Sequence, residues 1–201
     1  MIRERVLDGP HQPTAVLRQL GFLTEFVALA ARSDGLRAAI LVGSMAGGTA
    51  DEMSDVDLVL VTSPPGAFRG REAWRSLIPG RVLYASESSG SAGSHIQLVT
   101  GDLVCVDLTL SARRWLPCLL PPFRVLFDKD GAVAELGTAE LGSRVVGTSE
   151  GVPDLPLALL AIARHHMRGE TERALSELDD VIRHLPRQGA KMGKEKQQAR
   201  A

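Results

Sequence analysis

The sequence is poor in aromatic side chains, which make up 4% of its 201 residues, although apolar residues as a whole reach an ordinary 44%. A chain of this length can bury a core of its own, so that core must rest mainly on Leu, Val, Ile and Ala. Cysteine is also scarce: Cys105 and Cys118 both lie in apolar stretches, and they form no C-x-x-C pair. Both are therefore expected to be buried, reduced thiols of a cytosolic protein.

An excess of charge is missing too, since 23 basic residues stand against 24 acidic ones, for a net charge of −1. A protein that coats nucleic acid needs a basic excess to neutralise phosphates, so a nucleic-acid partner and template-independent RNA extension are both disfavoured. No apolar run reaches membrane-spanning length, and no apolar core of a signal peptide follows Met1. These absences predict a cytoplasmic protein with no membrane partner.

The apolar pattern predicts alternating helices and strands through the first two thirds of the chain. A helix is expected over 13–32 and a short one over 69–77. The Ser/Gly-rich stretch 86–94 predicts a mobile loop, 115–122 a proline-rich connector, and the pair Gly101-Asp102 the turn of a hairpin. Strands are expected at 38–42, 56–62, 81–85, 95–100, 103–110 and 124–127.

The last third of the sequence predicts a helical hairpin of 155–167 and 171–185, with Gly169 between the helices. Leu175, Leu178, Ile182 and Leu185 form an apolar stripe that must pack against something. The basic stretch 187–201 lacks periodicity and predicts a disordered tail. The fold class is therefore α/β, or α+β in looser terms: a small mixed sheet flanked by helices over 1–145, then a helical subdomain over 150–186.

One segment carries the chemistry: a strand, then Gly43-Ser44, then ten residues, then the pair Asp55 and Asp57 at the start of a second strand. Gly43 permits a sharp turn and a close approach to a ligand, and Ser44 with nearby N–H groups can hold phosphate oxygens. Residues two apart on a strand share a face, so both carboxylates are expected side by side. The arrangement predicts a site for Mg²⁺ and a nucleoside triphosphate.

Asp107 is a third acid of interest because it interrupts the apolar strand Val104–Leu108, where an unpaired buried charge is costly. A metal shared with Asp55 and Asp57 would give it a partner. Asp107 could also act as a general base toward an attacking hydroxyl. Pairing with an arginine such as Arg113 is the alternative that the sequence leaves open.

The run from Gly43 to Leu58 resembles the signature of the DNA polymerase β-like nucleotidyltransferase superfamily, and it looks most similar to small bacterial enzymes related to aminoglycoside adenylyltransferases. The resemblance extends over roughly residues 13–131. It implies a mixed sheet flanked by helices, nucleotide binding at Gly43 and Ser44, and catalytic, metal-binding aspartates at Asp55, Asp57 and Asp107. Such relatives usually carry a basic residue where this chain has Gly47, so one phosphate contact is missing here.

The reaction that the resemblance implies is transfer of a nucleoside monophosphate, AMP from ATP in the first instance, to a hydroxyl of a small-molecule acceptor. Pyrophosphate is released, and two Mg²⁺ ions assist. An acceptor site between the sheet and the hairpin, near Glu177 and Asp180, would suit a cationic aminosugar. The alternatives are adenylylation of a protein partner, as by an antitoxin-like nucleotidyltransferase, and a nucleotide-binding module without turnover, which the three acids disfavour.

Overall fold

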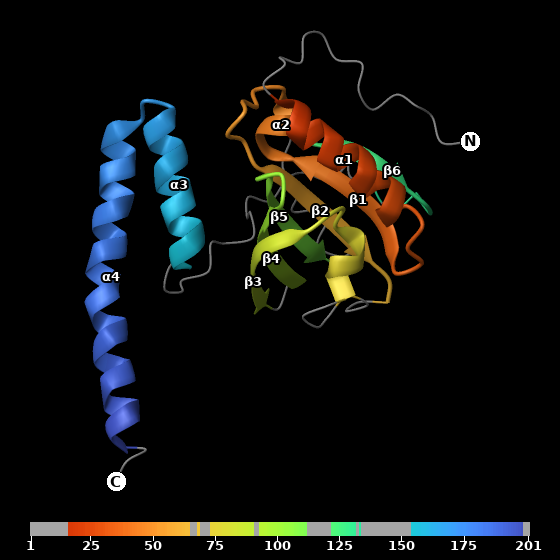
Figure 1. Ribbon diagram of the computed structural model, residues 1–201. Helices are drawn as coiled ribbons and strands as arrows, with labels where there is room; N and C mark the ends of the chain where they lie inside the picture. The colour runs from red at the N-terminus through yellow and green to blue at the C-terminus, as the bar shows by residue number, and fades with distance from the viewer. Residues whose placement is uncertain are drawn as a thin grey trace, which may run out of the picture. The chain divides into compact units, whose positions relative to one another are not determined.

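The computed structural model describes residues 16–64, 68, 73–90, 93–111, 122–131, 133 and 154–198, of which 89–90 and 186–198 are described by their backbone alone. The chain divides into two compact units, Met1–Gly147 and Thr148–Ala201. The first unit contains a sheet with helices, and the second a pair of helices (Figure 1). Each unit is described by itself below.

The six described strands of the first unit form one mixed sheet in the order β3-β4-β5-β2-β1-β6. Strands β2 and β5 run parallel, and every other neighbouring pair is antiparallel. The predicted mixed sheet is therefore confirmed. The strands are β1 (Leu36–Val42), β2 (Val56–Thr62), β3 (Val82–Gly90), β4 (Gly93–Thr100), β5 (Cys105–Ser111) and β6 (Arg124–Asp128).

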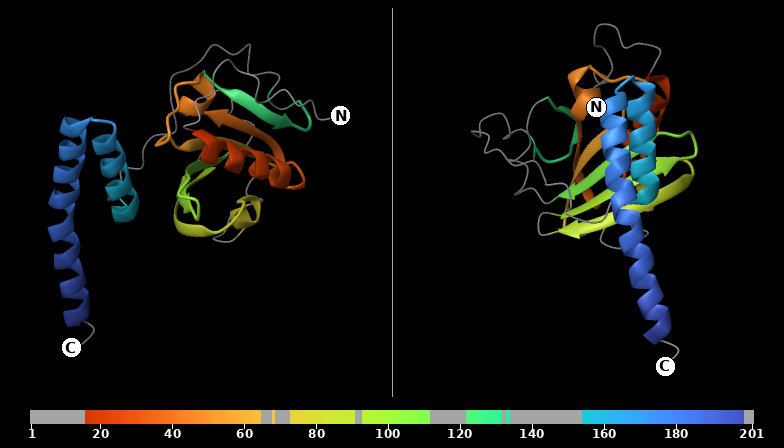
Figure 2. Two further views of the ribbon diagram at one scale, coloured as in Figure 1. Left: turned by 45° about the horizontal axis from the view of Figure 1, so that its top comes forward. Right: turned by 90° about the vertical axis from the view of Figure 1, so that its left-hand side faces the viewer.

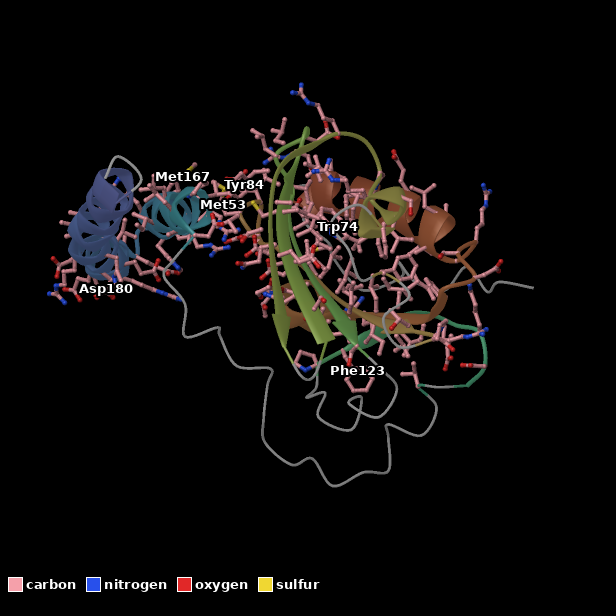
Figure 3. The ribbon with its side chains drawn as sticks, turned by 90° about the horizontal axis from the view of Figure 1, so that it is seen from below. Met53, Trp74, Tyr84, Phe123, Met167 and Asp180 are labelled. Atoms are coloured by element: carbon pink, nitrogen blue, oxygen red, sulfur yellow. The ribbon has the colours of Figure 1, made fainter. Side chains whose placement is uncertain are left out.

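Helix α1 (Leu17–Ala30) covers one face of this sheet (Figure 2), and the main core lies between them. The core contains the expected aliphatic residues of β2, β4 and β5, but the few aromatics contribute more than their number suggests. Phe26 is fully buried, and Trp74 in the 3₁₀ helix η2 (Ala73–Leu77) is 2% exposed (Figure 3). The Trp74 indole donates to Glu87 Oε2 at 3.4 Å, which satisfies its buried N–H.

The Ser/Gly-rich stretch 86–94 was expected to be a mobile loop, and this prediction is wrong. Strand β3 continues to Gly90 and β4 begins at Gly93, with Ser88 paired to His95 across the ladder. The small residues have a steric role, because a Cβ on Gly93 would lie 1.9 Å from the carbonyl oxygen of Leu110 on β5. Pairing between strands thus overrides the weak strand propensity of Ser and Gly.

The predicted hairpin at Gly101-Asp102 is confirmed, since β4 and β5 pair antiparallel on either side of it. The turn also requires a positive φ of 59° at Leu103. The backbone N–H of Leu103 donates to the carbonyl of Thr100 at 3.0 Å. This turn fixes which residues of β4 stand beside which residues of β5.

The second unit is a helical hairpin of α3 (Leu155–Met167) and α4 (Thr171–Gln198), joined through Gly169 at φ 78°. Asp154 caps α3 by accepting from Leu157 N at 3.5 Å. Helix α4 runs on to Gln198, where the sequence predicted a disordered tail over 187–201. Lys, Glu, Gln, Arg and Ala make up most of this stretch and are good helix formers, which outweighs the unfavourable Gly189 and Gly193. Among the described helices, none combines the length and apolar character that crossing a bilayer requires.

Candidate active site

Two carboxylates stand side by side in the centre of the sheet. Asp57 of β2 is the Cα partner of Asp107 of β5, and both side chains are partly buried. Their neighbours Val56, Leu58 and Val106 point into the core beneath α1, so alternation along the strands turns both aspartates to the opposite face. The sheet register therefore brings together two of the three acids that the sequence selected.

The proximity of these carboxylates changes their protonation. Burial, together with the charge of Asp107, raises the pKa of Asp57 from 3.8 to about 6. Burial raises the pKa of Asp107 as well, while His95 and a hydrogen bond from Gln97 oppose the rise. Two like charges in a partly dry site repel, and a cation bound between them would relieve that repulsion.

Gly43 lies directly against this pair. The Cα partner of Val42 at the end of β1 is Asp57, and Gly43 follows with a φ of 68°. A Cβ on Gly43 would lie 2.1 Å from Asp57 Oδ2, so no larger residue fits without moving the carboxylate. Gly43 also begins the short helix α2 (Gly43–Gly47), which contains Ser44. The glycine turn predicted from the sequence is thus present, next to the acid.

Asp55 is placed differently from the expectation of a shared strand face. Strand β2 begins at Val56, so Asp55 precedes it and strand alternation does not fix its side chain. The segment leading to it is held by an internal turn, in which the Ser54 hydroxyl donates to Asp51 Oδ1 at 2.8 Å. It is also held by Gln19 of α1, whose amide donates to the carbonyls of Glu52 at 3.0 Å and Ser54 at 3.2 Å.

A three-ligand metal cluster is not formed within the described residues, where no three His, Cys, Asp or Glu side chains are grouped as a metal would need. The neighbouring pair Asp57 and Asp107 nevertheless fits Mg²⁺. This ion usually keeps several waters and takes one or two protein carboxylates together with substrate phosphates. Participation of Asp55 as a third ligand stays a prediction.

The sequence reasoning missed the two polar residues of β4 that accompany Asp107. Gln97 is the Cα partner of Asp107, and its amide donates to Asp107 Oδ2 at 3.4 Å. His95 Nε2 lies 4.0 Å from the same oxygen. His95 and Gln97 are two residues apart, which indicates that they share a face of the strand. The sequence does not show that this strand pairs with β5 and so places both residues beside Asp107. The alternative partner, Arg113, lies outside the described residues.

Cys105 shares this face of β5 and is half-buried with a free thiol. Burial, with a contribution from Asp107, raises the pKa of Cys105 to about 11. The side chain is therefore a neutral thiol at physiological pH and not a nucleophile. Cys105 is a free thiol, as expected, but it is half-buried where the sequence predicted burial, and Cys118 lies outside the described residues.

Residues 27–86 match the model of a family described as a nucleotidyltransferase domain. The chain carries a nucleotidyltransferase domain. The matched region runs from α1 into β3 and includes Gly43, Ser44, Asp55 and Asp57, while Asp107 lies beyond it. The resemblance to the polymerase β-like superfamily is thus confirmed on the motif that suggested it.

Among solved structures, the chain is similar to an aminoglycoside 6-adenyltransferase from Bacillus subtilis, at 15% identity and a TM-score of 0.41. The similarity covers 78% of this chain and 60% of that one, so the chain spans less than two thirds of the length of that enzyme. No curated protein sequence matches the chain significantly.

Proposed function

We propose that the nucleotidyltransferase domain is catalytically active and transfers a nucleoside monophosphate, AMP from ATP, to a hydroxyl of a small-molecule acceptor. The observation that carries this proposal is the adjacent pair Asp57 and Asp107, packed against Gly43. A domain that only bound nucleotide would gain nothing from two partly buried acids that repel each other. A domain that must gather cations around a reacting phosphate needs them.

Each residue of the site has a separate task in this reaction. The N–H groups at the start of α2 and the Ser44 hydroxyl hold phosphate oxygens, and Gly43 allows the phosphates to approach the backbone. Asp57 and Asp107, with Asp55 from the preceding turn, would hold Mg²⁺. When bound, Mg²⁺ neutralises the charge that develops on the phosphate oxygens.

Asp107 is proposed as the proton acceptor. The acceptor oxygen forms a bond to the α-phosphorus, the bond from that phosphorus to the pyrophosphate oxygen breaks, and the hydroxyl proton passes to Asp107. A base works best when its pKa approaches the operating pH. Burial moves the pKa of Asp107 in that direction, while His95 and the hydrogen bond from Gln97 oppose the rise.

A small acceptor is proposed because the net charge of −1 offers no general attraction for a polyanion. Attraction of a cationic aminosugar by Glu177 and Asp180 of α4 is less favoured, because both acids already have basic neighbours. Glu177 Oε1 lies 3.3 Å from Arg173 Nε, and Asp180 Oδ1 lies 3.5 Å from Arg183 Nη1. The placement of that acceptor between the two units stays a prediction. Adenylylation of a protein partner is retained as an outcome of the test below.

The test is incubation with ATP, Mg²⁺ and a panel of aminoglycosides, using ATP labelled either at the α- or at the γ-phosphate. Transfer of AMP predicts label on the acceptor from the α-phosphate alone, and the γ-label should appear in pyrophosphate. An acceptor labelled from the γ-phosphate would contradict the proposal in favour of phosphoryl transfer. Label on a co-purified protein, with none on a small molecule, would identify a protein acceptor. Nucleotide binding without release of pyrophosphate would leave only a binding module.

A further inference from the structure

Asp107 lies between two unlike neighbours in the sheet, because β5 is flanked by β2 on one side and β4 on the other. On the β2 side stands Asp57, whose negative charge repels it. On the β4 side stand Gln97 and His95, which both face Asp107 Oδ2, at 3.4 Å and 4.0 Å. Among the residues that the structure describes, the attractive contacts to the carboxylate are thus confined to one side.

The same two contacts are also confined to one oxygen. Both reach Oδ2, and neither uses Oδ1. The last torsion of an aspartate is broad and nearly two-fold, so an unheld carboxylate beside a like charge would sample many orientations. A donor on one oxygen selects an orientation and leaves the second oxygen for another ligand.

The chemical identity of the donor matters as much as its position. Gln97 is neutral, so it holds Asp107 without cancelling the negative charge that a cation would need. An ammonium group at this place would hold the same oxygen but compete with the cation for it. Hydrogen-bonding partners of metal-ligating carboxylates commonly change metal affinity or activity by 10- to 100-fold when they are removed.

We propose that Gln97 is a positioning residue of this site: its amide holds Oδ2 of Asp107 and leaves Oδ1 for the cation and the attacking hydroxyl. The inference rests on the proposed function. His95 Nε2 lies 4.0 Å from the same oxygen, too far for a hydrogen bond, so its influence on the pKa of Asp107 is electrostatic and it does not hold the carboxylate in one orientation. Gln97 itself contacts Asp107 and acts through it.

The first test measures cation binding without turnover, by titrating the full chain with Mn²⁺ and following its electron paramagnetic resonance. Gln97→Met keeps the length of the side chain and removes the donor, and it should weaken Mn²⁺ binding on the order of tenfold. Gln97→Lys keeps a donor and adds a charge, and it should weaken binding further. Val99→Ala, on the same strand and face but paired with Cys105, is the matched control and should bind Mn²⁺ as the wild type does.

The second test uses the rate of pyrophosphate release. Gln97→Met should lower kcat on the order of tenfold and leave the KM for ATP nearly unchanged, since Gly43 and Ser44 are untouched. A purely structural role for Gln97 would instead lower the melting temperature and leave kcat per folded molecule intact. If Gln97→Met does not fold, Gln97→Thr, a strand former too short to reach Asp107, replaces it.

Two outcomes overturn the inference, and they are distinguishable from failure of the proposed function. Wild-type Mn²⁺ affinity in Gln97→Met shows that the amide does not position Asp107, even if the enzyme is active. Wild-type affinity in Gln97→Lys shows that a neutral donor is not required. A wild-type chain that binds Mn²⁺ but transfers no nucleotide contradicts the proposed function alone. A wild-type chain that binds no Mn²⁺, either alone or together with a non-hydrolysable ATP analogue, overturns both.

Discussion

Ionisable side chains gather in both units of the protein, with opposite electrostatic character. In the sheet, Asp57 and Asp107 are neighbours of the same charge. In the helical hairpin, His165 is 9% exposed and stands between two acids, with Nδ1 2.6 Å from Glu170 Oε2 and Nε2 3.4 Å from Glu177 Oε1. Arg173 lies within ion-pair distance of both glutamates. The two glutamates of the hairpin share a permanently charged cation, Arg173, whereas each acid of the sheet pair has another acid beside it.

This difference separates a structural cluster from a functional one. The His165 cluster joins α3 to α4, and Glu170 and Glu177 each have Arg173 and His165 within ion-pair or hydrogen-bond distance, so the cluster has an evident structural role. The sheet pair raises the pKa of Asp57 to about 6, and the structure tolerates that repulsion in the middle of its strands. Asp57 is held in an unfavourable charge state, and the backbone at Gly43 lies directly beside it. A ligand is expected at such a place.

Removing one acid from each cluster should produce the largest difference between the two units. Asp107→Asn should lower kcat by a factor on the order of 10² or more, because base and cation ligand are lost together. Its melting temperature should not fall. Glu170→Gln in the hairpin should leave kcat unchanged. Steady-state pyrophosphate release and thermal melting on both variants measure these effects. A lowered kcat in Glu170→Gln would contradict a purely structural role for the hairpin cluster.

A second prediction concerns the close approach of Gly43 to Asp57. Gly43→Ala should weaken Mg-ATP binding at least about tenfold, because its Cβ would occupy the position of Asp57 Oδ2. Gly48→Ala is the matched control, since Gly48 has a similar φ of 75° with nothing within 4 Å of a Cβ. Both variants carry a left-handed strain of roughly 1 kcal/mol. Equal binding by the two in calorimetry would show that the contact with Asp57 is unimportant.

A third prediction uses the raised pKa of Asp57. A cation binds the ionised carboxylate, so Mn²⁺ affinity should fall as the pH is lowered through about 6. At pH 5 roughly one tenth of Asp57 would remain ionised, which predicts a loss of affinity on the order of tenfold relative to pH 7.5. Titration at several pH values measures this. A midpoint near pH 4 would indicate that Asp57 is not perturbed by its neighbour.

The smallest effects expected are on stability, and they should have opposite signs in the two clusters. The folded pKa of Asp57 lies above 3.8, so its ionised form opposes folding above about pH 6, and this opposition disappears as the pH falls toward 4. Asp57→Asn should therefore raise the metal-free melting temperature at pH 7.5 by roughly 2–4 °C, and this gain should vanish at pH 4. His165→Ala should lower the melting temperature, because it removes the partner of Glu170 and Glu177. Calorimetric melts of both variants decide the point.

The sequence was sufficient for the elements with strong local patterns. The bounds of β2 and α3 agree with the prediction, because an apolar run interrupted only by Asp57 and a Leu- and Ala-rich stretch that ends just before Gly169 are local signals. The glycine turn at Gly43 and the outward face of Asp107 were also predictable. They depend on the special conformation of glycine and on strand alternation.

The features that sequence reasoning missed depend on contacts between distant segments. Gln97 meets Asp107 only through the register of β4 on β5, and Gln19 of α1 reaches the carbonyls of Glu52 and Ser54 across more than thirty residues. Residues 86–90, 93 and 94 form parts of β3 and β4, because the backbone of β5 packs closely against Gly93. The position of Asp55 depends on where β2 begins, and strand ends are the least predictable part of such a pattern.

The central claim is that Asp55 and Asp57, the two acids of the nucleotidyltransferase motif, bind the metal–nucleotide complex. Calorimetric titration of the wild type and of the Asp55→Asn, Asp57→Asn double variant with Mg-ATP, at pH 7.5, tests it most directly. We expect measurable binding by the wild type and none by the double variant, with the far-ultraviolet circular dichroism of the two unchanged. An unaltered Mg-ATP affinity in a folded double variant would contradict the account.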